Sequence, residues 1–177
     1  TRKMKAIEVY EQVIAESAFY IMQERRRAVQ DLGDLVRDFY RTISGQKDSV
    51  SLRYQSALPQ EGGVTAILEK FKTNRQREME LGYTLMGPHR DDLKIFLKER
   101  DAHPFASEGE MRSLAAALRL AEWERMRHVI DRSPLLLVDD FGISLDPSRL
   151  QNLVTIFESL GQVVITCPKV PHSLSLK

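Results

Sequence analysis

Hydrophobic residues recur at steps of three and four between residues 7 and 43. This spacing predicts a long amphipathic helix or a pair of helices, because it gathers apolar side chains on one face. Such a stripe usually packs on other helices. It is interrupted at residues 25–27, where we expect a bend, an exposed segment or a docking face. The stripe contains Ile7, Tyr10, Ile14, Ala18, Ile21, Ala28, Leu32, Leu35 and Phe39.

A strand and a second helix are predicted next. Residues 50–54 alternate as a strand does, residues 58–63 read as a loop, and residues 64–81 return to helical spacing with Gly82 placed to cap the end. The second half of this helix is rich in cations. Such a run is usually a solvated face, and the alternative is a contact with nucleic acid. The basic residues of this helix and of the interruption are Lys70, Lys72, Arg75, Arg77, Arg25, Arg26 and Arg27.

Short apolar runs replace the long helical pattern after Gly82. They predict strands at 83–86, 93–97, 135–138 and 163–166 and helices at 107–130 and from Pro147 onward, with Asp146 as N-cap. The run at 135–138 suits a strand buried on both faces. Strand, helix, strand implies a parallel crossover. We therefore predict an α/β fold, with a helical lobe at 1–80 and part of a parallel-sheet lobe at 81–177.

Composition is that of an ordinary soluble globular protein. The 177 residues include 26 basic and 25 acidic side chains, and this balance excludes a strongly polycationic binder. The only cysteine cannot form an internal disulfide, and no run is long or apolar enough for a membrane span or a signal peptide. We expect a cytoplasmic protein. The chain starts with Thr1 inside a helical pattern, so we also expect a fragment.

Two adjacent acids, Asp139 and Asp140, follow the apolar run at 135–138. Open parallel sheets bind ligands at the carboxyl ends of their strands. One acid there can hold Mg²⁺ and its neighbour can accept a proton from an attacking water, which are the two tasks of phosphoryl transfer. The alternative is a turn former or a helix cap.

Ser107 and Glu110 have the spacing of a capping box at the start of the helix predicted at 107–130. A capping box alone is enough to explain why serine and glutamate stand at these two positions. A helix N-terminus opened by serine and by Gly109 is also suited to bind phosphate, because its N–H groups and its dipole favour an anion. The loop at 141–146 joins the acid-tipped strand to the next helix, so we expect it beside any ligand at that edge.

Taken together, the order and spacing of these strings resemble an ABC-type ATPase head. The matching elements are a signature motif at 107–110, a Walker B strand at 135–140 and a D-loop at 145–146. The string Gly-Pro-His-Arg-Asp-Asp-Leu at 87–93 narrows the resemblance to the RecF family of DNA replication and repair proteins, related to SMC and Rad50 heads. Its polar members are His89, Arg90, Asp91 and Asp92. A turn braced by Arg–Asp pairs is the alternative role for this string.

The resemblance implies an ATP-binding protein of DNA repair, recombination, replication and the SOS response. It implies Mg²⁺ at Asp139, a general base at Asp140, contacts from Ser107, Gly109 and Glu110 to ATP held by the opposite subunit, and Asp146 at the dimer interface. Its partners would be double-stranded and gapped DNA, a second copy in an ATP-dependent dimer, and RecO- and RecR-type mediators that promote RecA loading.

Three features depart from the family pattern. Glu108 and Glu110 add acid to the signature motif, and Ile143 replaces the usual D-loop serine. None of the nine glycines is followed by lysine, so the chain lacks a P-loop. We therefore expect no ATPase activity from the chain alone. The alternatives are a non-catalytic helical interaction module and another SMC- or Rad50-type head, although those insert far longer coiled coils than the roughly 80 residues here.

Overall fold

The computed structural model describes residues 2–45 and 48–167. Contacts between residues divide the chain into two compact units. Unit 1 comprises Thr1–Gln30 and Arg53–Lys94, and unit 2 comprises Asp31–Leu52 and Ile95–Lys177. The units interleave along the sequence, whereas we predicted one boundary near residue 80. Within the described residues, no helix combines the length and the apolar character that crossing a membrane requires.

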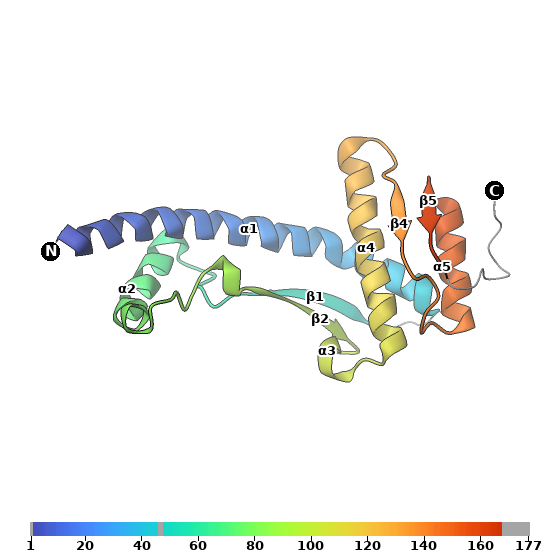
Figure 1. Cartoon of the computed structure of the whole chain (residues 1–177), viewed down its shortest axis with the longest axis horizontal. Helices are drawn as coiled ribbons and strands as arrows, with labels where there is room; N and C mark the ends of the chain where they lie inside the picture. Colours follow the sequence, from blue (N-terminus) through green and yellow to red (C-terminus); the bar gives the residue numbers. More distant parts are fainter. Residues whose placement is uncertain (1, 46–47, 168–177) are drawn as a thin grey trace. The chain divides into compact units, whose positions relative to one another are not determined.

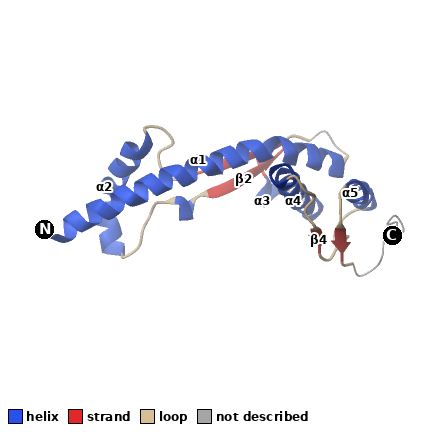
Figure 2. Ribbon diagram, turned by 90° about the horizontal axis from the view of Figure 1, so that it is seen from above, coloured by secondary structure: helices blue, strands red, loops and turns tan. Residues whose placement is uncertain are grey.

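The long amphipathic pattern forms one helix, α1 (Arg2–Ser44), which runs unbroken through residues 25–27 (Figures 1 and 2). Its first half departs from the predicted stripe. Ala15 and Met22 are buried there, whereas Tyr10 and Ile14 are 69% and 49% exposed. Ala18 is buried as predicted, but its buried neighbours on the helix are Ala15 and Met22 in place of Ile14 and Ile21.

Unit 1 packs around α2 (Gly63–Leu81), which buries Ile67 and Phe71. These side chains form one cluster with Ala15, Ala18, Met22 and Leu58. Gly82 ends the helix as predicted, in the left-handed conformation, with its N–H donating to the Glu78 carbonyl at 2.9 Å.

The strand predicted at 83–86 is wrong. The segment is a loop that leads into a short 3₁₀ helix, η1 (Pro88–Arg90). The Leu85 N–H donates to the Glu78 carboxylate at 2.6 Å, and the side chain of Met86 packs on the unit 1 cluster. Residues 83–86 therefore contact the end of α2 instead of pairing with a strand.

Three strands form a small sheet in the order β1 (Val50–Gln55), β2 (Asp92–Leu97), β3 (Arg100–Asp101). β2 and β3 pair antiparallel through a tight turn in which Lys98 and Glu99 have φ of 53° and 63°. A single helical turn, α3 (Ala102–Phe105), follows. The strands predicted at 50–54 and 93–97 are confirmed.

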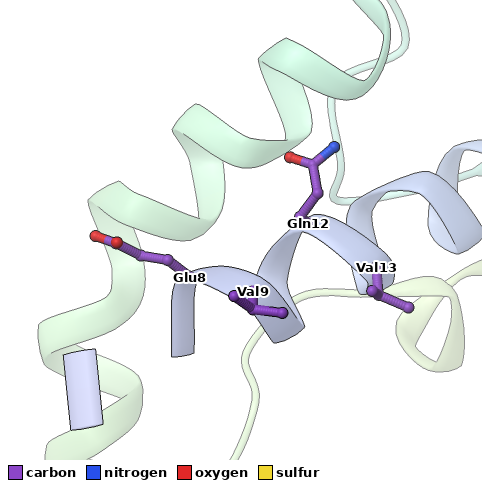
Figure 3. Close-up of a pocket in the computed structure, with 4 residues that line it drawn as sticks. All are labelled: Glu8, Val9, Gln12 and Val13. Atoms are coloured by element: carbon purple, nitrogen blue, oxygen red, sulfur yellow. The ribbon is translucent and has the colours of Figure 1, made fainter. Parts of the chain in front are cut away.

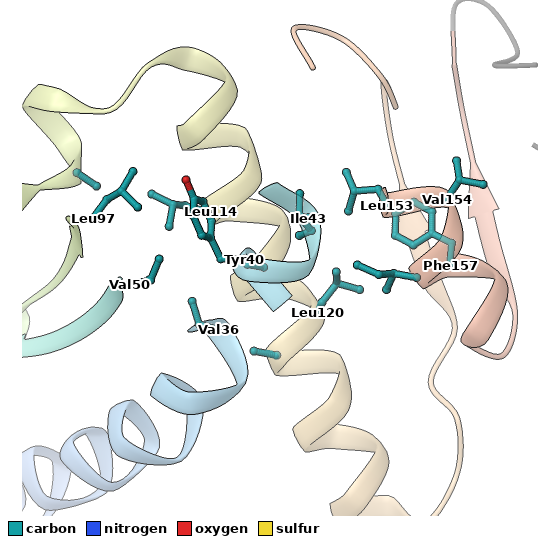
Figure 4. Packing of buried hydrophobic residues seen from close by; sticks show 14 of the residues in the cluster. Val36, Tyr40, Ile43, Val50, Leu97, Leu114, Leu120, Leu153, Val154 and Phe157 are labelled. Atoms are coloured by element: carbon teal, nitrogen blue, oxygen red, sulfur yellow. The ribbon is translucent and has the colours of Figure 1, made fainter. Parts of the chain in front are cut away.

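Unit 2 is built on α4 (Glu108–Ile130). The helix α5 (Pro147–Ser159) connects β4 (Leu136–Val138) to β5 (Val163–Ile165), and the two strands pair in parallel as predicted. The core joins α4 to the end of α1 and to α5 (Figure 4). It contains Leu114, Ala117, Leu120 and Ala121 of α4, Val36, Tyr40 and Ile43 of α1, and Leu153, Val154 and Phe157 of α5.

The prediction that the strand at 135–138 is buried on both faces is wrong for this chain. Leu136 and Val138 pack on the core, but Leu137 is 69% exposed and Val164 of β5 is 47% exposed. Parallel sheets are usually covered on both faces. The two-stranded sheet thus leaves one apolar face open.

Replacing Leu120 tests the core of unit 2. This side chain is 2% exposed, so Leu120→Ala should lower the free energy of unfolding by about 2–5 kcal/mol through lost burial and a cavity. Val129, on the same helix, is 75% exposed, and Val129→Ala should change it by less than about 0.5 kcal/mol. Urea unfolding followed by Trp123 fluorescence measures both. Equal effects of the two variants would contradict the assigned packing.

Candidate functional site

Asp139 and Asp140 lie at the carboxyl end of β4, beside Thr166 at the end of β5. The Thr166 hydroxyl donates a hydrogen bond to the Asp139 carboxylate and accepts one from the Asp140 N–H at 3.0 Å. Asp140 has a φ of 51°, and its N–H also contacts Asp139 Oδ1 at 3.1 Å. The neighbouring strand therefore fixes the turn that presents both acids.

Thr166 was not among the predicted site residues. Its signal in the sequence is a polar residue directly after the second parallel strand, which places it at the same sheet edge as the acids.

Both carboxylates are exposed, and Mg²⁺ is usually held by one or two carboxylates together with several waters. Across residues 2–45 and 48–167, no group of three or more His, Cys, Asp or Glu side chains could hold a metal ion. Asp139 and Asp140 could supply carboxylate ligands to a Mg²⁺ whose other ligands are water and phosphate oxygens.

The N-terminus of α4 forms the predicted capping box. Ser107 Oγ accepts from the Glu110 N–H at 3.3 Å, and the Glu110 carboxylate accepts from the Ser107 N–H at 2.9 Å and from its hydroxyl at 2.8 Å. These bonds from Ser107, and after them Lys98, lower the pKa of Glu110. The capping role is thus confirmed, and a phosphate would have to compete with Glu110 for the Ser107 donors.

The loop at 141–146 lies against this first turn. A Cβ on Gly109 would be 3.6 Å from the Ser144 carbonyl. A hydrogen bond from the Ser144 side chain, followed by the Arg112 guanidinium, lowers the pKa of Glu108. The two strings that resemble a signature motif and a D-loop are therefore neighbours within unit 2.

Asp146 caps α5 as predicted. Its carboxylate accepts from the Arg149 N–H at 3.0 Å and pairs with Arg149 Nε at 2.9 Å. The backbone hydrogen bond from Arg149 is the main reason that the pKa of Asp146 is lowered. Asp146 is therefore ionised and fixed at the edge of the loop.

The basic residues proposed for DNA differ in their surroundings. Arg75 is held in unit 1 by a bidentate pair with Glu11, at 2.9 and 2.5 Å, and its side chain is only 16% exposed. This pair connects α2 to α1 within unit 1.

The other basic residues proposed for DNA have mostly local partners. Arg25 binds Asp91 and the Pro88 carbonyl, Arg26 contacts Gln23, Arg27 pairs with Glu24 and Lys72 pairs with Glu69. Lys70 is half-buried and Arg77 is exposed.

The string at 87–93 forms a braced turn. The side chain of Asp91 is 1% exposed and accepts from Tyr54 and from Arg25 at 3.3 Å. Burial first, and then the Asp91 carboxylate, raise the pKa of Tyr54. Gly87 has a φ of 145°, and a Cβ there would lie 2.8 Å from the His89 ring, so the turn requires glycine.

The remaining members of the string lie at the surface. His89 contacts the Thr84 hydroxyl at 3.3 Å, Arg90 donates to the Thr84 carbonyl at 3.2 Å, and Asp92 pairs with Lys94 at 3.2 Å. Arg–Asp bracing thus occurs through Arg25 and Asp91, and Arg90 faces the loop after α2.

The lowered pKa of Glu110 predicts a pH-dependent contribution to stability. A carboxylate whose pKa falls on folding stabilises the protein above its unfolded pKa of about 4.3, and this contribution is lost as pH falls through the folded value. Glu110→Gln keeps an acceptor for the Ser107 N–H but loses the charge, so it should lower stability by about 0.3–1 kcal/mol at pH 7. The difference from wild type should shrink as pH falls below about 4. A difference that stayed constant down to pH 2.5 in urea unfolding would contradict the charged cap.

Comparison with known proteins identifies relatives of nearly the whole chain. No family model matches. The chain is 40% identical over 172 residues to the DNA replication and repair protein RecF of Protochlamydia amoebophila, covering 93% of this chain and 48% of that protein. It is 39% identical over 158 residues to RecF of Herpetosiphon aurantiacus, covering 89% and 41%.

Solved structures share the fold. A structure described as the recombination mediator protein RecF with ATP in the RecFOR pathway superposes with a TM-score of 0.79 at 23% identity, over 93% of this chain and 45% of that one. The chain thus spans about half the length of the proteins it matches. In sequence and in fold, this chain belongs to the RecF family.

Proposed function

We propose that this chain is the signature-bearing part of a RecF-type ATPase that acts in recombinational repair and replication restart. The observation that carries the proposal is the placement of the capped first turn of α4 against the loop of Asp146. The acids after β4 support it, since they stand at the sheet edge where nucleotides bind. The family membership and the ATP-bound RecF relatives point the same way.

The residues divide the work of phosphoryl transfer between them. Asp139, oriented by Thr166, would hold Mg²⁺ through water, and Asp140 would accept a proton from the attacking water. Bound MgATP supplies the phosphoryl group. Ser107 and the N–H groups near Gly109 would contact the γ-phosphate held by the opposite subunit. For that contact the Ser107 hydroxyl must turn away from the Glu110 carboxylate.

We assign the binding of the nucleotide phosphates to a segment outside this chain. The sequence has no Gly-Lys step and therefore no P-loop lysine. The open apolar face formed by Leu137 and Val164 is suited to be covered by further elements of an ABC-type lobe. We accordingly propose that the chain alone neither binds ATP tightly nor hydrolyses it.

The partners follow from the same proposal. ATP would join two copies, and the dimer would bind double-stranded and gapped DNA and work with RecO- and RecR-type mediators in loading RecA. Exposed Arg77 and Arg27 are better placed to meet DNA phosphates than Arg75, whose guanidinium is occupied by Glu11. Contacts to phosphate would make this binding strongly dependent on salt.

A second candidate function is a helical module that binds another protein. The observation that favours it is a set of exposed apolar side chains on the first half of α1. Val9 and Val13 line a shallow depression with Glu8 and Gln12 (Figure 3). Val9 is 65% exposed and Tyr20 is 67% exposed. In this function the acids at the sheet edge would be turn residues only.

Replacing Asp140 separates the two candidates. In the longer protein that supplies the nucleotide-gripping segment, Asp140→Asn should lower ATP turnover at least about 100-fold, because the general base is lost. Asparagine tolerates a positive φ, so the turn should persist. Asp38→Asn, an exposed change on α1, is the control and should retain full turnover. A folded Asp140→Asn variant with normal turnover would exclude Asp140 as the general base, whereas a wild-type longer protein that binds its partner but does not hydrolyse ATP would favour the module.

A further inference from the structure

Arg149, in the first turn of α5, reaches across to the first turn of α4. Its side chain is 12% exposed. Nη1 donates to Ser113 Oγ at 2.7 Å and to the Gly109 carbonyl at 3.3 Å, while Nε pairs with the Asp146 carboxylate at 2.9 Å. One guanidinium therefore binds both the glycine of the signature-like turn and the aspartate of the D-loop-like turn.

A third element approaches the same group. Tyr40, at the end of α1, is fully buried. Burial raises the pKa of its hydroxyl, and the Arg149 guanidinium partly offsets that rise. The charge of Arg149 thus lies where α1, α4 and α5 converge within unit 2.

The partners of Arg149 also have other hydrogen-bonding partners. Ser113 is fully buried, but its hydroxyl already donates to the Gly109 carbonyl at 2.8 Å. Asp146 is 52% exposed, so water can solvate it, and its cap to α5 uses the backbone N–H of residue 149. Burying a cation has a desolvation cost that an apolar side chain of similar length avoids. The contacts of Arg149 therefore specify geometry more than they add stability.

We propose that Arg149 is a positioning residue that locks the first turn of α4 to the loop of Asp146, so that Ser107, Gly109 and Asp146 face a nucleotide as one rigid edge. This inference rests on the proposed function. Arg149 acts through Gly109 and Asp146 and is not itself assigned a contact to ATP. Its loss should lower the rate of turnover and leave ATP affinity, which the nucleotide-gripping segment determines, nearly unchanged.

Kinetics of the longer protein provide the first test. Arg149→Met should lower kcat for ATP about tenfold and change KM less than about twofold, whereas Arg149→Lys, which keeps the charge, should recover part of the rate. Ser113→Ala removes one acceptor of the guanidinium. The double variant should be no slower than Arg149→Met, because both changes break the same contact. Arg119→Met is the control, since the Arg119 side chain is 78% exposed and pairs with Glu122 on the surface of α4.

Hydrogen exchange of the 177-residue chain provides a second test that does not depend on ATP. In Arg149→Met, amides at 108–112 and 143–146 should exchange at least about tenfold faster, while those at 117–125 should keep their wild-type rates. Unchanged exchange at both turns would overturn the inference, and so would faster exchange along all of α4, which would indicate a structural role. If the longer wild-type protein does not hydrolyse ATP but the two turns of the 177-residue chain loosen as expected, the positioning role holds and the proposed function fails.

Discussion

The close packing of α4 against the end of α1 and against α5 is the constraint on which unit 2 depends. Ala117 and Ala121 are fully buried, and these small side chains let the neighbouring helices approach. A helix is rigid along its length, so fixing its middle also fixes its first turn. The position of Ser107 and Gly109 is therefore a consequence of core packing several turns away.

The N–H groups in the first turn of α4 favour a negative charge, and carboxylates of the chain already supply that charge. Glu108, Glu110 and Asp146 all have lowered pKa values through hydrogen bonds and nearby cations. An incoming phosphate would enter a site whose donors are occupied by carboxylates of the same chain. In this account the phosphate of a nucleotide replaces the Glu110 carboxylate as the acceptor for the Ser107 donors. The affinity for the nucleotide therefore depends on the free energy of this one helix cap.

Local patterns predicted most of the elements, and tertiary contacts explain where they failed. The caps at Ser107 and Asp146 follow from side-chain chemistry within a few residues, and so could be predicted from sequence. The loop at 83–86 was missed because the Glu78 carboxylate binds its backbone. The role of Arg149 was missed because Ser113 and Gly109 lie on another helix, 36 and 40 residues away, and sequence spacing carries no signal of such contacts. Thr166 was missed although its place directly after the second parallel strand is a signal, because its partner Asp139 lies 27 residues away.

Photolabelling tests the central claim, that the first turn of α4 faces the terminal phosphate of a nucleotide held by another subunit. The chain would be mixed with a full-length RecF relative and an ATP analogue that carries a photoreactive group on its γ-phosphate. Trypsin cleaves after Arg100 and Arg112, so the site lies in one peptide of this chain. The account predicts that mass spectrometry finds the label in residues 101–112, and that excess ATP removes it. Labelling confined to other peptides of the chain would contradict it.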